Sequence, residues 1–307
     1  MASIKRGFSY LFHNRAKFCD SIVKNYMTFL PNKLYLSLRY KFTMGRWINW
    51  KNPKTFTEKI QWLKVYNRKP ESTIMVDKYA VKEYVAKKIG KQYIIPTIAV
   101  WDTPEDIKWN ELPKQFVLKT THGGGGGVVL CRDKDSLNKE KVIEQLNDSM
   151  NFDIYTSLRE WPYKNVKKRI IAEEFIAAEK GSCQETSLLD YKFFCFNGKV
   201  RFFKVDFGRF VEHHANYYSP EGVLLDFGES GLEPDPNYKI ELPENLGAMI
   251  NIAEKLSCNQ SFLRVDLYNV NGKIYFGELT FYPASGLIPW TPDSVDEIIG
   301  SYIELEK

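Results

Sequence analysis

Two Asn-Gly pairs, Asn197-Gly198 and Asn271-Gly272, each separate two stretches of β-prone residues. Asn-Gly between such stretches is the strongest short-range signal for a tight turn joining antiparallel strands, since both residues tolerate positive φ. The first pair joins DYKFFCF to KVRFFKVDFG, and the second joins FLRVDLY to KIYFGELTF. Helix-like stretches lie between the groups of strands: NPKTFTEKIQWLKVY, KYAVKEYVAKKIG and ENLGAMINIAEKLS. The pattern predicts an α+β fold with mostly antiparallel strands.

A run of five glycines, Gly123 to Gly127, lies between the strand-like stretches FVLKTT and VVLC. Ordering five glycines costs more conformational entropy than ordering any other pentapeptide. No helix pattern follows the run, as in a dinucleotide fingerprint, and no Gly-Lys-Ser/Thr ends it, as in a Walker A loop. We predict a flap whose backbone N–H groups cover phosphates, with a ligand-free hairpin turn as the alternative. Lys119 lies on the strand before the run, within reach of phosphate oxygens, whereas Lys78 taken alone is typical of a solvated lysine.

Two acids, Asp266 and Glu278, interrupt the apolar strands of the second hairpin. A three-residue loop at 271–273 would place them opposite each other on one face, and a two-residue turn at Asn271-Gly272 would place them on opposite faces. Opposed carboxylates repel unless a cation lies between them, and a hard divalent cation bound to phosphates would serve. Arg264 would share the face of Asp266, either as an ion pair or as the group that offsets charge developing during phosphoryl transfer.

Six motifs taken in order resemble the ATP-grasp superfamily: VDKYAVKEYV, IIPTIAVW, FVLKTTHGGGGG, RIIAEEFI, DYKFFCFNGK and RVDLYNVNGKIYFGELT. The chain looks most like the TupA-like (teichuronopeptide biosynthesis) ATP-grasp family, over about residues 50–300. The resemblance implies two α+β subdomains that clasp ATP. Residues 76–172 would form the first subdomain with its glycine lid, and residues 173–307 the second with a metal site. A basic, aromatic, helical segment, residues 1–75, would precede them.

The resemblance also assigns roles to individual residues. Lys78 and Lys119 would contact the ATP phosphates, Arg264 and Lys119 would act in catalysis, and Asp190 would lie beside the ribose. Asp266 and Glu278 would hold Mg²⁺, with Thr280 at a position where many relatives have an asparagine ligand. The lid would be Gly123, Gly124, Gly125, Gly126 and Gly127, and the adenine hinge Glu173, Glu174, Phe175 and Ile176.

The activity that the resemblance implies is an ATP- and Mg²⁺-dependent carboxylate–amine ligase acting through an acyl phosphate. Its substrates would be an amino acid and a uronic acid, carried on a glycan or nucleotide sugar, in the biosynthesis of a bacterial capsule or other surface polysaccharide. One rival is a phosphotransferase acting on a sugar, with His213 or His214 as its general base. Another is a glycosyltransferase-like or glycan-binding protein without ligase activity, which intact Lys119, Asp266 and Glu278 oppose.

The first fifty residues carry nine lysines and arginines, a single acid, Asp20, and eleven aromatic residues. Their net charge is therefore +8, which leaves −3 for the rest of the chain. Cations interleaved with aromatic rings suit an anionic membrane surface or an acidic glycan, and a basic helical face packed on the body is the alternative. Nucleic acid is not an expected partner, because the basic excess stops at residue 51 and no recognition motif follows.

Five cysteines are scattered without CxxC spacing: Cys19, Cys131, Cys183, Cys195 and Cys258. An odd number without such spacing argues for reduced thiols and against a disulfide framework or zinc site. No window reaches the roughly 18 uncharged apolar residues of a membrane span. The basic N-terminus lacks a small-residue cleavage site, so a signal peptide is not expected. We expect a cytoplasmic protein with peripheral contact at the inner membrane face.

Overall fold

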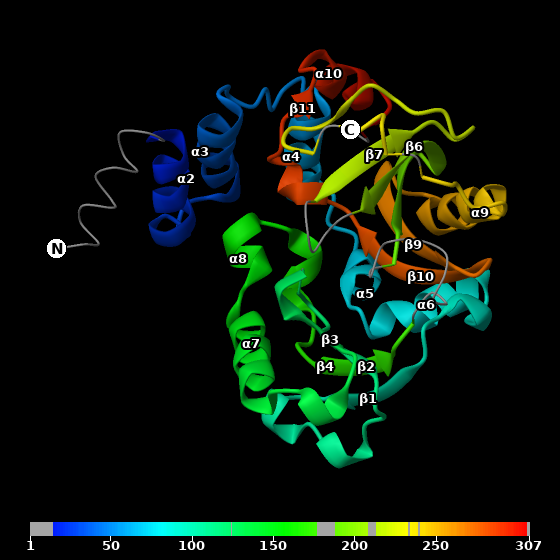
Figure 1. Ribbon diagram of the computed structural model, residues 1–307. Helices are drawn as coiled ribbons and strands as arrows, with labels where there is room; N and C mark the ends of the chain where they lie inside the picture. The colour runs from blue at the N-terminus through cyan, green and yellow to red at the C-terminus, as the bar shows by residue number, and fades with distance from the viewer. Residues whose placement is uncertain are drawn as a thin grey trace.

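The computed structural model describes residues 15–123, 125–176, 188–207, 213–232, 234–238 and 240–305. Gly124 of the predicted lid and Cys183 lie outside these residues. Helices flank two larger antiparallel sheets and one two-stranded sheet, which confirms the α+β prediction (Figure 1). Among the described helices, none has the length and apolar character that crossing a membrane requires.

The first sheet has four strands in the order β1-β4-β2-β3. Its strands are β1 (Thr97–Trp101), β2 (Phe116–Thr120), β3 (Val128–Cys131) and β4 (Ile170–Glu174). The glycine run connects β2 to β3, and its last three residues form a 3₁₀ turn, η4 (Gly125–Gly127). Helix α7 (Lys139–Asn151) packs on this sheet through Val142 and Leu146, which lie in one apolar cluster with Phe116 and Leu118.

The second sheet has five strands in the order β10-β9-β5-β6-β7. Its strands are β5 (Asp190–Phe196), β6 (Lys199–Phe207), β7 (His214–Tyr218), β9 (Phe262–Val270) and β10 (Lys273–Thr280). Both Asn-Gly pairs form the predicted turns, with φ of +48° at Asn197 and +53° at Asn271. A short sheet pairs β8 (Gly228–Glu229) with β11 (Trp290–Thr291). The expected hairpins are therefore present.

Several helices surround the second sheet: α4 (Phe56–Tyr66), α5 (Glu71–Val76), α6 (Ala80–Ile89), α9 (Leu246–Ser257) and α10 (Ser294–Ser301). Helix α4 begins with a capping box, in which Thr55 Oγ1 accepts from the Glu58 N–H and the Glu58 side chain accepts from the Thr55 N–H. Phe56 and Ile60 of α4 lie in the same large core as the phenylalanines of β5 and β6. Helix α4 thus packs directly against the body of the protein.

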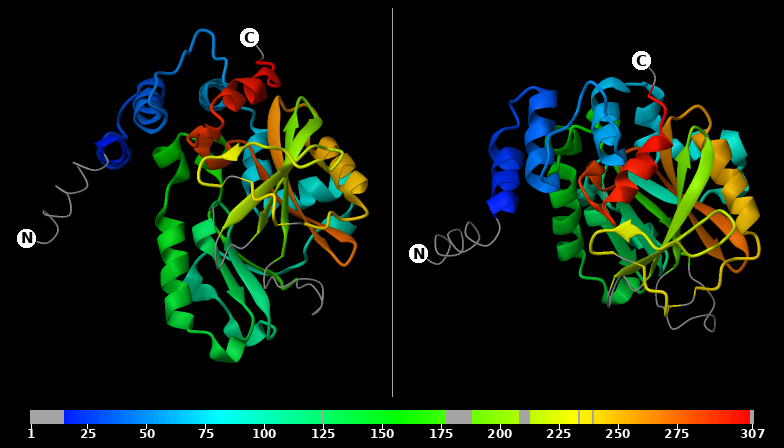
Figure 2. Two further views of the ribbon diagram at one scale, coloured as in Figure 1. Left: turned by 45° about the horizontal axis from the view of Figure 1, so that its top comes forward. Right: turned by 90° about the horizontal axis from the view of Figure 1, so that it is seen from above.

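Helices α2 (Arg15–Tyr26) and α3 (Asn32–Met44) form a hairpin at one edge of the molecule, seen in both views of Figure 2. Their own small core contains Val23, Tyr35, Leu36 and Tyr40. The hairpin is fastened to the short helix α8 (Ile154–Leu158), because the Tyr35 hydroxyl donates to the Ser157 carbonyl at 2.8 Å. Part of the basic N-terminal segment is therefore packed structure.

Candidate active site

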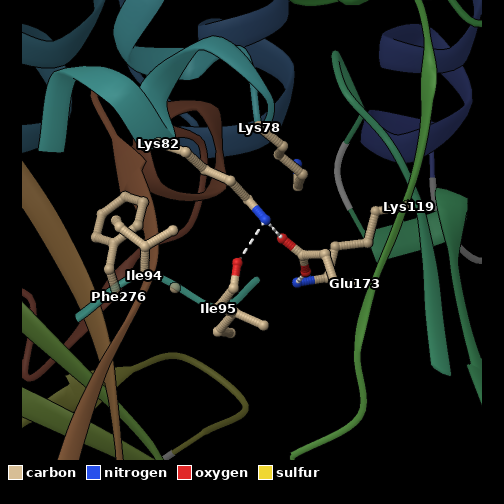
Figure 3. Close-up of a pocket in the computed structure, with 8 residues that line it drawn as sticks. Lys78, Lys82, Ile94, Ile95, Lys119, Glu173 and Phe276 are labelled. Atoms are coloured by element: carbon tan, nitrogen blue, oxygen red, sulfur yellow. Dashed lines mark hydrogen bonds and ion pairs between the residues drawn. The ribbon is translucent and has the colours of Figure 1, made fainter. Parts of the chain in front are cut away.

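A small closed pocket lies where the four-stranded sheet meets β10 (Figure 3). Its volume is about 10 Å³, room for about one water molecule. A nucleotide would need the two sheets to move apart. Charged and apolar side chains from both halves line it: Lys78, Lys82, Ile94, Ile95, Lys119, Glu173, Phe276 and Gly277.

Glu173 is a buried acid that pairs with two of the lysines of this pocket. Its carboxylate lies 2.5 Å from Lys82 Nζ and 2.6 Å from Lys119 Nζ. Burial opposes its ionisation, but the charges of Lys119 and Lys82 outweigh burial and lower the pKa of Glu173. The sequence assigned Lys119 to the ATP phosphates and Glu173 to the adenine hinge, and it did not identify Lys82. A helical spacing of four from Lys78 was the available signal, because residues i and i+4 share a helix face.

Lys78 is buried, and its Nζ links the glycine run to the second sheet. The ammonium donates to the carbonyl of Gly123 and lies 3.9 Å from Glu278 Oε2. Burial lowers the pKa of Lys78. The solvated lysine that its position alone predicted is therefore wrong. Lys78 thus lies between the glycine run and Glu278, and its assignment to the ATP phosphates stays a prediction.

The glycine run is held close to α7. Thr120 Oγ1 and Ser149 Oγ form a hydrogen bond of 2.9 Å beneath the run, and the Gln145 side-chain amide donates to the carbonyls of Gly126 and Val128. A Cβ added at Gly127 would lie 2.1 Å from Thr120 Oγ1, whereas one added at Gly126 meets no atom within 4 Å. The glycines thus serve different purposes: Gly127 permits close packing, and Gly126 leaves open space above the backbone.

The hinge residues lie at the end of β4 and just beyond it. Glu174 is exposed, Phe175 and Ile176 are half-buried, and the N–H of Glu174 donates to the Pro96 carbonyl at 3.1 Å. The Glu173 side chain faces the lysines. The assignment of these four residues to adenine stays a prediction.

A β-bulge brings Asp266 and Glu278 together. The turn is the two-residue Asn271-Gly272, so that Val270 pairs with Lys273, and the expected three-residue loop is wrong. The register shifts between Phe276 and Glu278, and Glu278 then pairs with Asp266. The extra residue is Gly277, where a Cβ would lie 3.0 Å from the Asp266 carbonyl oxygen. The bulge restores the shared face that the two-residue turn alone would have abolished.

Arg264 binds this acid pair together with Thr280. Its guanidinium contacts both carboxylate oxygens of Asp266 at 2.7 Å, and Nη2 lies 3.1 Å from Glu278 Oε1 and 3.1 Å from Thr280 Oγ1. Burial raises the pKa of Asp266 to about 7, against the opposing charges of Arg264 and Lys192. For Glu278, whose side chain is 40% exposed, the charges of Lys78 and Arg264 outweigh the effect of burial and lower the pKa to about 2.

Two carboxylates and a hydroxyl oxygen form a donor set that suits a hard cation such as Mg²⁺. Asp266 and Glu278 pair across neighbouring strands, and the Thr280 hydroxyl donates to Glu278 Oε1 at 3.3 Å. No group of three or more histidine, cysteine or acidic side chains that could hold a metal occurs among the described residues. The predicted metal residues therefore fit a cation that takes its remaining ligands from phosphate oxygens and water.

A row of buried charges continues from this site across the second sheet. Lys192 lies 4.0 Å from Asp266 and 2.6 Å from Asp206, and it also pairs with Asp190. Lys204 continues the row, 3.7 Å from Asp206 and 2.7 Å from Glu229. Sequence reasoning named only Asp190 of this inner group. Polar residues two apart in the apolar strands β5 and β6 were the signal for the others, because such residues share one face of a sheet.

The two neighbouring histidines have different surroundings. His213 Nε2 lies 3.1 Å from Asp206 Oδ1, at the end of the charge row, and its side chain is 41% exposed. His214 begins β7 and stacks on Phe207 with ring centroids 5.6 Å apart. The His213 ring therefore contacts the charged row at Asp206.

A strained turn follows the predicted metal residues on β10. Ala284, Ser285 and Gly286 have φ of +46°, +59° and +62°, which is unfavourable for the first two. Helix α4 holds this turn through two buried side chains: Gln61 donates to the carbonyls of Ser285 and Gly286, and Lys64 donates to the Ser285 carbonyl and hydroxyl at 2.7 and 2.6 Å. The sequence offered no signal for this arrangement, which joins segments about 220 residues apart.

The solved structures that resemble this chain share little sequence identity with it. The chain is similar to D-alanine–D-alanine ligase from Bacillus anthracis complexed with ATP, at 19% identity and a TM-score of 0.37, over 68% of this chain and 54% of that one. It is also similar to D-alanine–D-alanine ligase from Helicobacter pylori, at 16% identity and a TM-score of 0.40, over 81% and 69% of the two chains. An ADP complex of N5-carboxyaminoimidazole ribonucleotide synthetase gives 15% identity and a TM-score of 0.42, over 73% and 50%. The chain thus spans about half the length of the first of these enzymes.

No curated protein matches the chain. The model of the TupA-like ATPgrasp family does match, over residues 58–304. This match covers the greater part of the chain and includes the glycine run, Lys78, Lys119 and the Asp266–Glu278 pair. It confirms the resemblance and the fold that the motifs predicted. The chain belongs to the TupA-like ATP-grasp family.

Proposed function

We propose that this protein is an ATP- and Mg²⁺-dependent carboxylate–amine ligase that acts through an acyl phosphate. The observation that supports it best is the convergence of the two halves on the acid pair. Lys78, which donates to the first lid glycine, lies 3.9 Å from Glu278, which shares Arg264 with Asp266. A cationic group for phosphate and an acid pair for a metal are thus in one place. The proposal retains the division into residues 1–75, 76–172 and 173–307.

Nucleotide binding would proceed by exchange of charged partners. Lys82 and Lys119 share the single carboxylate of Glu173, so phosphate oxygens would compete with this carboxylate for the two ammonium groups. The glycine run would close over the phosphates and exclude water, which offsets its ordering cost. Adenine would lie against residues 173–176, and the ribose beside Asp190.

Asp266 and Glu278 would hold Mg²⁺, with Thr280 contributing its hydroxyl directly or through water. When bound, the cation would offset negative charge on the transferring phosphate. Arg264 is already fixed by four hydrogen bonds from its guanidinium to Asp266, Glu278 and Thr280. Such preorganised charge is effective against charge that develops only in the transition state.

In the proposed reaction, a substrate carboxylate oxygen attacks the γ-phosphorus of ATP, the bond to the β-phosphate oxygen breaks, and ADP leaves. An amine then attacks the carbonyl carbon of the acyl phosphate, the C–O bond to phosphate breaks, and inorganic phosphate leaves. Arg264 would stabilise the oxyanion formed in the second step. Lys119 and Lys78 would hold the phosphates in line.

The proposed substrates are an amino acid and a uronic acid of a surface glycan or its nucleotide-sugar precursor, within capsule biosynthesis. The family match and the cationic site support this assignment, because both substrates carry carboxylates. A cytoplasmic location follows from the need for ATP. Peripheral contact with the anionic inner leaflet would bring the enzyme to lipid-linked glycan intermediates.

The test is a product analysis with purified protein, ATP, Mg²⁺ and pools of amino acids and uronates. A ligase gives ADP, inorganic phosphate and a new amide in equal amounts, and the amide identifies the pair of substrates. Omitting either pool should stop amide formation. ATP consumption without an amide under every pairing would contradict the proposal, and absence of nucleotide binding would favour a glycan-binding or glycosyltransferase-like protein.

A phosphotransferase acting on a sugar hydroxyl is the second candidate. The contact of His213 Nε2 with Asp206 at 3.1 Å favours it, because a carboxylate can orient an imidazole as a general base. A phosphotransferase would transfer phosphate to the sugar and release no inorganic phosphate. The same product analysis therefore separates the two reactions.

A further inference from the structure

The junction between α2 and α3 exposes a group of aromatic, aliphatic and basic side chains. We name Lys24, Tyr26, Phe29, Lys33 and Leu34 the tip patch. Tyr26 is 76% exposed, Phe29 80% and Leu34 47%. Single exposed apolar residues are ordinary, but three within nine residues at the end of a helical hairpin form a patch.

The hairpin does not need these side chains for its own packing. Its core is formed by other residues, and Met27 and Leu30 of the same junction turn inward onto that core. Tyr26 and Phe29 therefore project away from the hairpin instead of filling it. Removing their rings should cost the fold little.

The backbone of the junction is held in place from the lid half of the protein. Arg159 is buried, stacks on the Tyr35 ring at 4.3 Å, and donates to the carbonyls of Thr28 and Leu30. These two residues flank Phe29 directly. The exposed ring is thus presented from an anchored turn.

Within the first fifty residues, the charge that remains after internal pairing is positive. Asp20 is the only acid in the first fifty residues, and both its oxygens are bound by Arg39, at 2.7 and 2.9 Å. Arg46 likewise pairs with Asp296 at 2.5 Å. Ion pairs recorded among the described residues involve none of Lys17, Lys24, Lys33 and Lys41. Lys33 Nζ lies over the Tyr66 ring, 4.9 Å from its centroid, and Lys41 Nζ donates to the Gly45 carbonyl, but neither contact neutralises the positive charge.

We propose that the tip patch docks on the surface of an anionic lipid bilayer, with Tyr26 and Phe29 at the interface and Lys24 and Lys33 against lipid headgroups. Rings that project from a convex end, flanked by cations, match the chemistry of a bilayer interface. A soluble acidic glycan would instead favour a concave site with converging polar groups. The inference rests on the membrane contact in the proposed function and does not depend on ligase chemistry.

The test is flotation of the full-length protein with phosphatidylcholine vesicles, with and without phosphatidylglycerol, and needs no nucleotide or substrate. Wild type should float with the anionic vesicles only, and binding should weaken steeply with salt. Lys24→Gln/Lys33→Gln should lower the partition coefficient about thirtyfold, since each cation near an anionic surface contributes about 1 kcal/mol. Tyr26→Ser/Phe29→Ser should lower it about tenfold, even at low salt.

Matched controls come from other exposed surfaces. Ile298 is 54% exposed and Phe152 41%, and Lys87 and Lys88 end α6. Phe152→Ser/Ile298→Ser and Lys87→Gln/Lys88→Gln should bind vesicles as wild type does. Circular dichroism and thermal melting of each variant verify that the fold is intact.

Three outcomes would overturn the inference. Wild type that floats with neither vesicle excludes bilayer docking. Wild type that floats while both tip variants bind as strongly places the contact elsewhere on the chain. Binding to soluble polygalacturonate, without flotation and weakened by the lysine variant, assigns the patch to an acidic glycan. Each result leaves the product analysis for ligase activity unaffected.

Discussion

The buried charges of the candidate site are paired with charges of opposite sign in this structure. Glu173 lies between Lys82 and Lys119, and Arg264 lies among Asp266, Glu278 and Thr280. A buried ion pair contributes little net stability, but removing one partner leaves a costly unpaired charge. Ligand binding at such a site proceeds by exchange of partners and needs no new burial of charge.

The first residue-scale prediction concerns the acid pair. Asp266→Asn and Glu278→Gln should each abolish ATP turnover while the protein stays folded, because each removes a metal-binding charge but leaves Arg264 paired with the other acid. Turnover is measured by ADP release and folding by circular dichroism. Glu254→Gln is the control, since Glu254 pairs with Lys199 on the surface, at 2.7 Å. Unfolding of both acid variants, with the control folded, would assign the pair a structural role.

The second residue-scale prediction concerns Lys64, which is 1% exposed. Burial lowers its pKa to about 7, against the attraction of Glu160, while the unfolded chain keeps the ordinary value of 10.5. Between these values the unfolded state binds more protons, so the contribution of Lys64 to stability rises with pH. Below about pH 7 both states are protonated and the full cost of the buried charge remains.

The prediction is tested by measuring the free energy of unfolding of wild type and of Lys64→Met with denaturant from pH 6 to 9 and comparing the two at each pH. The free energy of unfolding of wild type should increase relative to the variant as the pH rises above about 7. Lys87→Met is the control, because Lys87 is exposed. The difference in unfolding free energy between wild type and this variant should not change with pH. A difference between wild type and Lys64→Met that stays flat over this pH range would show that the buried amine stays charged.

At the scale of single elements, the sequence predicted the two hairpins but not the pairing register of strands β9 and β10. Asn197-Gly198 and Asn271-Gly272 specify tight turns locally, because few other residues adopt positive φ at low cost. The bulge at Gly277 depends on how β10 packs beside β9, which is a nonlocal choice. An isolated glycine within a strand pattern is a known sign of a bulge, so Gly277 could have raised the question without answering it.

The glycine run gives the element-scale prediction. Gly127→Ala should lower thermal stability and ATP-dependent turnover, because its Cβ would lie 2.1 Å from Thr120 Oγ1 and 2.3 Å from Ser149 Oγ. Gly126→Ala is the matched control, since nothing lies within 4 Å of its added Cβ. Thermal melting and ATP-dependent turnover of the Gly127→Ala and Gly126→Ala variants test this prediction. Equal effects at both positions would show that backbone freedom alone is required.

Over the whole molecule, the N-terminal segment ties the two halves together. Tyr35, Arg39 and Arg159 fasten the α2–α3 hairpin to the end of α8, while Lys64 and Gln61 of α4 hold the strained turn after β10. Composition predicted a basic segment but not which charges are used internally. The partners of Arg39 and Arg46 lie 19 and 250 residues away, and only the folded chain brings such groups together.

Arg159→Met is the prediction at this scale. It should lower the free energy of unfolding by about 2–3 kcal/mol, because a buried charged donor to two carbonyls is lost. Proteolysis should also speed up in residues 27–31, which would no longer be fastened. Arg201→Met, which removes an exposed guanidinium 5.3 Å from the Tyr302 ring, is the control. Stability and cleavage like those of wild type would show that the hairpin is held by its apolar core.

Whether Asp266 and Glu278 lie on the same face of the sheet depends on where the hairpin accommodates its one extra residue, which here is Gly277. Deleting Gly277 would leave a regular ladder in which Glu278 follows Phe276 directly and still pairs with Asp266. Straightening the bulge while Gly277 stays would separate the acids, because with the two-residue turn Gly277 would pair with Asp266 and Glu278 would move to the other face. The extra residue can equally lie in the turn, since a three-residue turn without a bulge pairs Val270 with Ile274 and Asp266 with Glu278. Hairpins of this kind should therefore carry the extra residue in either place, and both forms would present the same acid pair.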